Sequence, residues 1–162
     1  MNKRHFSIHS TAMEVISTGS IYVFDIDGTI ANVQHRLPHI LGKPKGERDW
    51  NRFFSDAVLD TPIEWVIDLM HRLPQERIVL ITGRSDVIAD ITGMWLAKHK
   101  VPYAELRMRA QGHKAPDYVV KLEMADDYRG RIEFVVEDRQ SVVDMWRDNG
   151  INVLQCAKWD EE

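Results

Sequence analysis

Two aspartates end a short apolar run and are followed by a glycine and a threonine, in the stretch Ile21-Tyr22-Val23-Phe24-Asp25-Ile26-Asp27-Gly28-Thr29-Ile30. In an extended strand, side chains two residues apart point to the same side, so Asp25 and Asp27 emerge together at the carboxyl end of the strand. Two like charges this close are unfavourable unless a cation or a proton lies between them. The stretch therefore predicts a metal-assisted catalytic centre in which one aspartate is the nucleophile and its neighbour transfers protons.

A turn is the alternative interpretation of the same residues. An Asp-Gly turn capped by a second aspartate accounts for Asp27 and Gly28, but it does not account for Asp25 behind four apolar residues. Open α/β sheets bind their ligands just beyond the carboxyl ends of their strands, which is where both aspartates would lie. We therefore favour the catalytic interpretation.

Two further apolar runs end in polar groups. Ile78–Ile81 is followed by Thr82-Gly83-Arg84, and Ile132–Val136 is followed by Glu137-Asp138. A parallel sheet brings the carboxyl ends of its strands onto one edge, so these groups are expected beside the first aspartates. A helix just upstream of the last run carries Lys121, with Asp117 one turn earlier on the same face.

This set of side chains suits phosphoryl transfer, in which an anionic nucleophile must approach an anionic phosphate. A Mg²⁺ ion held by Asp25 and the carboxylates of Glu137 and Asp138 would neutralise that charge. Lys121 and the Thr82 hydroxyl would hold the remaining phosphate oxygens. We also expect a helix to begin directly after Gly83, where its first N–H groups would donate to the anion.

Strands and helices alternate along the chain, which predicts an α/β fold with a parallel sheet and helices on both faces. Further strands are expected over 104–109 and 151–156, and helices over 86–99, 116–128 and around 142–146. A helix is also expected from Thr61, because Thr61, Pro62 and Glu64 form a capping signature. Residues 31–60 are rich in proline and glycine and predict a loop or flap, in which Asp49–Phe54 forms one or two helical turns that pack Trp50, Phe53 and Phe54 inward.

Length and composition fit one soluble domain over residues 20–162, preceded by an N-terminal arm over residues 1–19. The formal net charge is -4, so any contact with nucleic acid needs a local basic patch. The single Cys156 excludes an internal disulfide and fits a reducing cytoplasm; in an apolar strand it is expected to be a buried small residue. No membrane span or signal peptide is expected, and no feature indicates a protein partner.

The ordered motifs resemble those of the haloacid dehalogenase superfamily. They are Asp25-Ile26-Asp27-Gly28-Thr29, Thr82-Gly83-Arg84, Lys121 and Glu137-Asp138, and the resemblance spans roughly residues 20–158. It implies a three-layer Rossmann-like fold, here without a large cap domain, because only about thirty residues separate the first motif from Thr61.

Within that superfamily, the chain looks like the 3′-phosphatase domain of bacteriophage polynucleotide kinases. The matching residues are Arg36, Gly83-Arg84, Pro116-Asp117 with Val119-Val120-Lys121, and the stretch 138–147. The resemblance implies an aspartyl-phosphate on Asp25, with Asp27 as general acid and then base. It also implies catalytic roles for Thr82 and Lys121, substrate contacts from Arg36, Gly83, Arg84 and Asp117, and Mg²⁺ held by Asp25, Asp27, Glu137 and Asp138. The family often has Asp-Asp where this chain has Glu137-Asp138, which leaves open which of the two binds the metal directly.

The expected substrates are 3′-phosphorylated DNA or RNA ends, and the alternative is free nucleotides or other small phosphomonoesters. An uncapped site leaves room for a polymer end, and two basic groups flank it in the sequence: His35 to Arg48, and Arg107, Arg109, His113 and Lys114. The chain contains no G-x-x-x-x-G-K-[ST] loop, so no kinase activity is expected.

Overall fold

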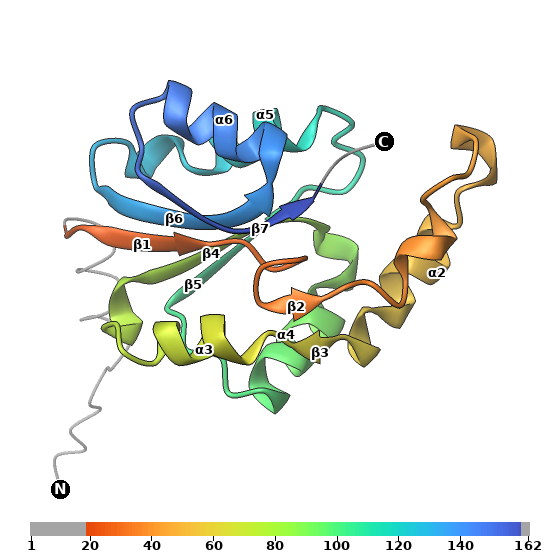
Figure 1. Ribbon diagram of the computed structural model, residues 1–162, viewed down its shortest axis with the longest axis horizontal. Coiled ribbons are helices and arrows are strands. Elements are labelled where there is room, and N and C mark those ends of the chain that lie inside the picture. Colours follow the sequence, from red (N-terminus) through yellow and green to blue (C-terminus); the bar gives the residue numbers. More distant parts are fainter. Residues whose placement is uncertain (1–18, 160–162) are drawn as a thin grey trace, which may run out of the picture.

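The computed structural model describes residues 19–159, so the expected N-terminal arm lies almost entirely outside the described residues. Five parallel strands form the central sheet in the order β5-β4-β1-β6-β7 (Figure 1). They are β1 (Ile21–Phe24), β4 (Ile78–Ser85), β5 (Glu105–Arg109), β6 (Ile132–Arg139) and β7 (Val153–Trp159). The predicted parallel sheet is therefore confirmed.

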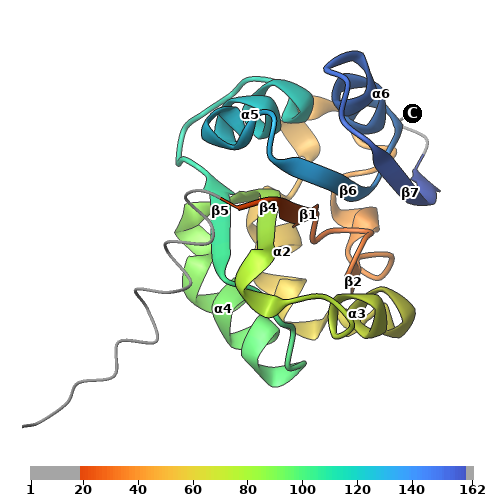
Figure 2. The ribbon, with the colours of Figure 1, turned by 90° about the vertical axis from the view of Figure 1, so that its left-hand side faces the viewer.

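Helices cover both faces of the sheet, as the edge-on view in Figure 2 shows. One face carries α3 (Glu64–Met70) and α4 (Ala89–Lys98), and the other carries α5 (Asp117–Met124) and α6 (Gln140–Asp148). The three-layer α/β architecture expected from the alternation of elements is confirmed. No helix among the described residues is long and apolar enough to cross a membrane.

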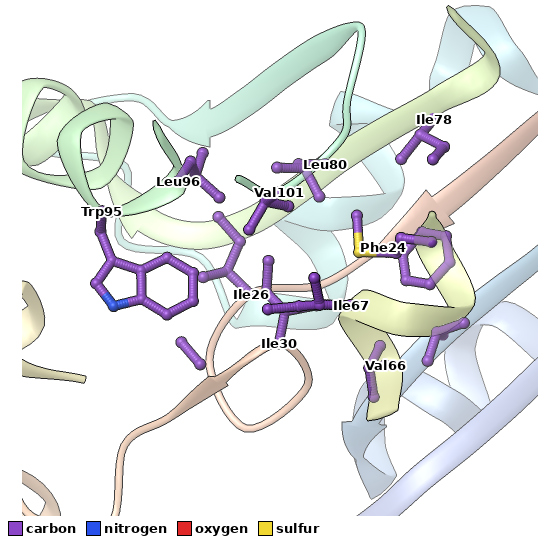
Figure 3. Close-up of a cluster of buried hydrophobic side chains, with 13 residues drawn as sticks. Phe24, Ile26, Ile30, Val66, Ile67, Ile78, Leu80, Trp95, Leu96 and Val101 are labelled. Atoms are coloured by element: carbon purple, nitrogen blue, oxygen red, sulfur yellow. The ribbon is translucent and has the colours of Figure 1, made fainter. Parts of the chain in front are cut away.

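Two hydrophobic cores separate the sheet from its helices. Alternation along the strands divides the side chains, so that Phe24 and Leu80 pack with Trp95 under α3 and α4 (Figure 3). Their neighbours Val23 and Val79 pack on the opposite side, in a cluster that includes Trp146. Both tryptophans are almost fully buried.

The chain order makes β1 a topological switch point. From β1 the chain adds β4 and then β5 on one side, and it returns to place β6 directly against β1 on the other. Crevices at such switch points, beyond the carboxyl ends of the strands, are the usual binding sites of open α/β sheets. The residues after β1 and β6 therefore face a natural ligand site.

The expected helix start at Thr61 is wrong. Thr61–Pro62 is a short strand, β3, which pairs antiparallel with β2 (Ala31–Asn32). The backbone N–H of Ile63 donates to the carbonyl of Ile30 at 2.8 Å, and α3 begins only at Glu64. Tertiary pairing of the two short strands overrides the local capping signature.

The segment between β2 and β3 is mostly irregular, as expected, and in Figure 1 it projects to one side of the sheet. It contains α2 (Trp50–Ser55), whose N-terminal backbone is capped by the Asp49 carboxylate at 2.9 Å. Phe53 is buried and Phe54 is half-buried, but Trp50 remains 43% exposed, so the expectation that it packs inward is wrong. Six residues of helix present only part of their circumference to the interior.

Candidate active site

The ends of β1, β4 and β6 bring the predicted polar groups together. The backbone N–H of Asp25 donates to the carbonyl of Val136 at 3.1 Å, which sets Asp25 beside Glu137 at the end of β6. Lys121, on α5, places its Nζ 2.8 Å from both Asp25 Oδ1 and Glu137 Oε2. The Lys121 ammonium group is therefore shared between two carboxylates, and all three side chains are buried.

A second group of charges surrounds Asp27. Arg36 and Arg84 each donate to Asp27 Oδ1 at 2.6 Å, and Arg84 donates again through its Nε at 2.9 Å. Behind them, the buried Asp60 accepts from both arginines at 2.8 Å. The two guanidinium groups are therefore held between two carboxylates, and only Asp27 is partly open to solvent.

Asp60 is a residue that the sequence analysis missed. It follows a 3₁₀ turn over Asp56–Leu59, and both arginines lie 24 positions away from it in the chain. His35 Nε2 lies 2.9 Å from Asp60 Oδ1 and donates to it in the tautomer that carries the proton on Nε2. No local motif marks the residue, because its role depends on partners that only the fold brings near.

Two glycines allow these groups to approach closely. Gly28 has φ +81° in the tight turn after Asp27, and a Cβ at this position would overlap the Asp138 carboxylate. A Cβ at Gly83 would overlap the carboxylate of Asp117. That carboxylate lies 3.4 Å from Lys121 Nζ and 3.0 Å from Arg109, which confirms that Asp117 and Lys121 share a helix face.

The helix expected directly after Gly83 is wrong. Strand β4 continues to Ser85, a 3₁₀ turn covers Asp86–Ile88, and α4 begins at Ala89. Thr82 is nevertheless buried at the sheet edge, where its hydroxyl accepts from the backbone N–H of Arg84 at 3.2 Å. The β4–β5 register shifts between Thr82 and Ser85, so the backbone at Gly83 leaves the regular ladder beside the site.

The two first-motif aspartates have opposite electrostatic environments. Burial and the nearby Glu137 raise the pKa of Asp25 to about 8, although Lys121 opposes this effect. Burial also acts to raise the pKa of Asp27, but Arg84 and Arg36 outweigh it and lower that pKa to about 2. Pairs of carboxyl groups whose pKa values are separated in this way are typical of acid–base and nucleophilic catalysis.

A cleft of about 860 Å³ opens onto Asp25, Asp27, Thr82 and Lys121. Seven lysine or arginine side chains among the described residues line it: Lys45, Arg48, Arg84, Arg109, Lys114, Lys121 and Arg139. Only three aspartates line the same cleft, so the lining carries four net positive charges although the whole chain carries -4. Such an excess of positive charge favours anionic ligands.

The basic residues flagged in the sequence divide between this cleft and another surface. Lys45, Arg48, Arg109, His113 and Lys114 line the cleft. In contrast, Arg107 pairs with Glu105 and Asp127 and covers the ring of Tyr128 at 4.0 Å, outside the cleft lining.

Residues 19–160 match the family model described as the polynucleotide kinase PNKP phosphatase domain. The chain belongs to this family. It is a phosphatase of the haloacid dehalogenase type, as the ordered motifs and the sheet predict.

Solved structures agree with this assignment. A chain in the structure of the Pnkp1/Rnl/Hen1 RNA repair complex is 26% identical, with a TM-score of 0.70 over 87% of the present chain and 43% of its own length. A second Pnkp1/Rnl/Hen1 structure gives 26% identity and a TM-score of 0.71, over 87% of the present chain and 47% of the other. The phosphatase thus spans less than half the length of these two matched chains. A hydrolase from Streptococcus pneumoniae TIGR4, 16% identical with a TM-score of 0.56 over 86% of the present chain and 94% of its own, shares the fold.

The phosphatase has a buried cluster of carboxylates that fits a divalent cation. Oxygen atoms of Asp25, Glu137 and Asp138 all lie within 4.8 Å of one another, and hard cations prefer such ligands. Burial, together with neighbouring carboxylates, raises the pKa of Glu137 to about 7 and that of Asp138 to about 6. A cation at this position would relieve the repulsion that raises these values.

The contacts within the cluster distinguish its members. Both carboxylate oxygens of Glu137 are engaged, one by Lys121 and the other by the backbone N–H groups of Asp138 and Arg139. Asp138 Oδ1 accepts from the Thr29 hydroxyl at 3.3 Å. The Asp27 side chain is not part of the cluster, because its carboxylate faces Arg36 and Arg84.

Cys156 is half-buried near this cluster, with its Sγ 3.6 Å from the Thr29 hydroxyl oxygen. Burial raises the pKa of the thiol to about 11. A thiol with a raised pKa is a weak nucleophile at neutral pH, which agrees with its expected role as a small packing residue.

Proposed function

We propose that this phosphatase is Mg²⁺-dependent and removes 3′-phosphates from polynucleotide ends through an aspartyl-phosphate on Asp25. The observation that carries the chemistry is the pair of opposed environments: Asp25 beside Lys121 in the cleft, and Asp27 clamped by Arg36 and Arg84. The family match and the positive cleft support a polynucleotide end as the substrate.

In the first step, Asp25 attacks phosphorus as the ionised carboxylate, a form that a bound cation would favour despite the raised pKa, and the bond from phosphorus to the 3′-oxygen breaks. Asp27 gives a proton to the leaving 3′-oxygen, which departs as a hydroxyl group. Since the arginines keep Asp27 ionised in the free enzyme, we infer that it receives this proton from the monoanionic form of the substrate phosphate, whose second pKa is about 6.

In the second step, Asp27 takes a proton from a water molecule that attacks the phosphorus of the aspartyl-phosphate. The bond between phosphorus and Asp25 breaks, which releases inorganic phosphate and regenerates the Asp25 carboxylate, and Asp27 then loses its proton to solvent. Lys121 and the Thr82 hydroxyl hold the non-reacting phosphate oxygens in both steps. Arg36 and Arg84 keep the Asp27 carboxylate in position between the two steps.

We infer that Asp25 and Asp138 hold the metal directly, because both oxygens of Glu137 already accept hydrogen bonds. Bound Mg²⁺ would neutralise the charge that builds up between the anionic nucleophile and the anionic phosphate. Glu137 has a different role, because its ion pair with Lys121 holds the ammonium group beside Asp25.

A panel of substrates tests this proposal. Oligonucleotides phosphorylated at the 3′ or the 5′ end, and the corresponding mononucleotides, are assayed for phosphate release with and without Mg²⁺. We expect Mg²⁺-dependent release from the 3′-phosphorylated oligonucleotide, and loss of that release in the Asp25→Asn variant. A preference for 5′ ends would contradict the proposed polarity.

A preference for mononucleotides would favour the alternative, a phosphatase of small phosphomonoesters. A salt titration separates the two, because contacts to several phosphates weaken steeply as the salt concentration rises. We expect KM for the oligonucleotide to rise with salt, and KM for the mononucleotide to change little.

A further inference from the structure

Aromatic side chains form one part of the catalytic cleft lining. Trp50 and Phe54 of α2 lie with ring centroids 5.9 Å apart and planes inclined by 29°, while Phe53 meets Trp50 edge-on at 5.7 Å. The guanidinium of Arg36 lies 4.3 Å from the centre of the Phe53 ring. The aromatic cluster therefore runs from an arginine that holds Asp27 out to the exposed ring of Trp50.

Packing in the hydrophobic core does not explain the position of the exposed Trp50 ring. Trp50 is 43% exposed, and its ring packs against those of Phe53 and Phe54. It also lines the cleft that contains Asp25. An exposed, supported aromatic face beside a catalytic centre is suited to stacking against a flat ring of the substrate.

Cations without carboxylate partners line the same cleft. Within residues 19–159, Lys45 and Lys114 are exposed and neither has an ion-pair partner, and Arg48 donates only to the backbone carbonyl of Lys43. Lys121 lies 2.8 Å from Asp25, so it would serve the phosphate under attack. These additional charges are therefore available for other phosphates of the same substrate.

We propose that Trp50 is the stacking platform for the base of the 3′-terminal nucleotide, and that Lys45 and Lys114 contact phosphodiester groups upstream of it. This inference rests on the proposed 3′-phosphatase activity, because it concerns how the polynucleotide that carries the reacting phosphate is bound. A nucleic-acid end offers a flat ring and a row of anions next to one phosphomonoester, which matches the groups that line this cleft. Stacking accepts any base, so the site selects a polymer end without selecting its sequence.

The test compares Trp50→Ala and Trp50→Phe with wild type on three substrates. These are a 3′-phosphorylated oligonucleotide, the same oligonucleotide with an abasic terminal nucleotide, and p-nitrophenyl phosphate. Base stacking on an aromatic side chain predicts that W50A lowers kcat/KM about tenfold for the first substrate, mainly through KM. W50F retains most of the activity, because it keeps a stacking face.

The abasic substrate distinguishes stacking from a structural effect. Wild type should lose about tenfold in kcat/KM when the terminal base is removed, whereas W50A should lose almost nothing further, because the partner ring is already absent. The matched control is Trp65→Ala, which removes a 55% exposed tryptophan of α3 that lies outside the cleft lining. Its kcat/KM for each of the three substrates should equal that of wild type. The inference is overturned if W50A lowers activity equally on all three substrates, or if the terminal base makes no difference to wild type.

Failure of the proposed function has a different signature. In that case wild type would hydrolyse p-nitrophenyl phosphate but not the 3′-phosphorylated oligonucleotide. The part of the inference that concerns the backbone is tested by K45Q combined with K114Q, which should flatten the salt dependence of KM for the oligonucleotide. An unchanged salt dependence would remove these lysines from the proposal.

Discussion

Replacing Asp60 by asparagine should destabilise the protein and slow the reaction together. The Asp60 carboxylate is fully buried and accepts from Arg36 Nε, Arg36 Nη2 and Arg84 Nη2, each at 2.8 Å. Without its charge, two buried guanidinium groups share the single carboxylate of Asp27. Removing one partner of a buried charge network costs about 3–5 kcal/mol of unfolding free energy, which corresponds to roughly 10 °C in Tm for a domain of this size.

The same change should reach the catalytic centre through Asp27. If the two arginines shift, the carboxylate that they hold moves with them, and a displacement of about 1 Å lowers catalytic rates by up to roughly a hundredfold. Unfolding in urea, followed by circular dichroism, measures the loss of stability. The turnover of folded D60N with a saturating phosphomonoester measures the loss of kcat.

Asp56→Asn is the matched control for this experiment. Asp56 is an aspartate of the preceding 3₁₀ turn that pairs with His39 at 2.9 Å and Arg52 at 3.8 Å, where it is partly exposed. Such pairs contribute about 1 kcal/mol or less, so D56N should remain close to wild type in both assays. If D60N also stayed close to wild type, Asp60 would not be the buried counterion that holds the arginines, and the reasoning would be refuted.

One further substitution and one change of conditions probe the same centre. Gly83→Ala should lower kcat/KM by at least tenfold, because its Cβ would displace the Asp117 carboxylate beside Lys121; wild-type kinetics would contradict this. Mg²⁺ affinity, measured by calorimetry, should rise between about pH 6 and pH 8. Metal binding requires Asp138 and Asp25 in their charged forms, and the pKa of Asp138 is raised to about 6 and that of Asp25 to about 8. Because these carboxyl groups bind protons more tightly in the folded than in the unfolded chain, their stabilising effect on the metal-free protein is complete below about pH 4 and is lost as the pH rises through about 8. The increase in Tm on adding Mg²⁺ should therefore be larger at high pH, and an equal increase at pH 6 and pH 8 would argue against these ligands.

The convergence of strand ends could be predicted because it depends on local patterns. Apolar runs that stop at Asp25, Thr82 and Glu137 mark buried strands, and a parallel sheet places their ends on one edge. The spacing of Asp117 and Lys121 likewise places both on one face of α5. Short-range periodicity and the rules of sheet topology were sufficient for these residues.

The features that could not be predicted depend on contacts between distant segments. Thr61 carries a capping signature, yet pairing with β2 makes it a strand residue. Asp60 directly precedes this strand, and it becomes a buried counterion only because the fold brings Arg36 and Arg84 within hydrogen-bond distance of its carboxylate. Trp50 is expected to pack inward from the sequence, but the short helix α2 leaves it partly exposed in the lining of the cleft. In each case tertiary structure overrides the local signal.

Trapping the phosphorylated enzyme tests the proposed chemistry most directly. Acid quenching during turnover of a 3′-phosphorylated oligonucleotide, followed by digestion and mass spectrometry, locates any covalent phosphoryl group. We predict one phosphoryl group on the peptide that contains Asp25, at that residue, and none in Asp25→Asn. A phosphoryl group on a different residue, or turnover by D25N at the wild-type rate, would contradict the assignment of Asp25 as the nucleophile.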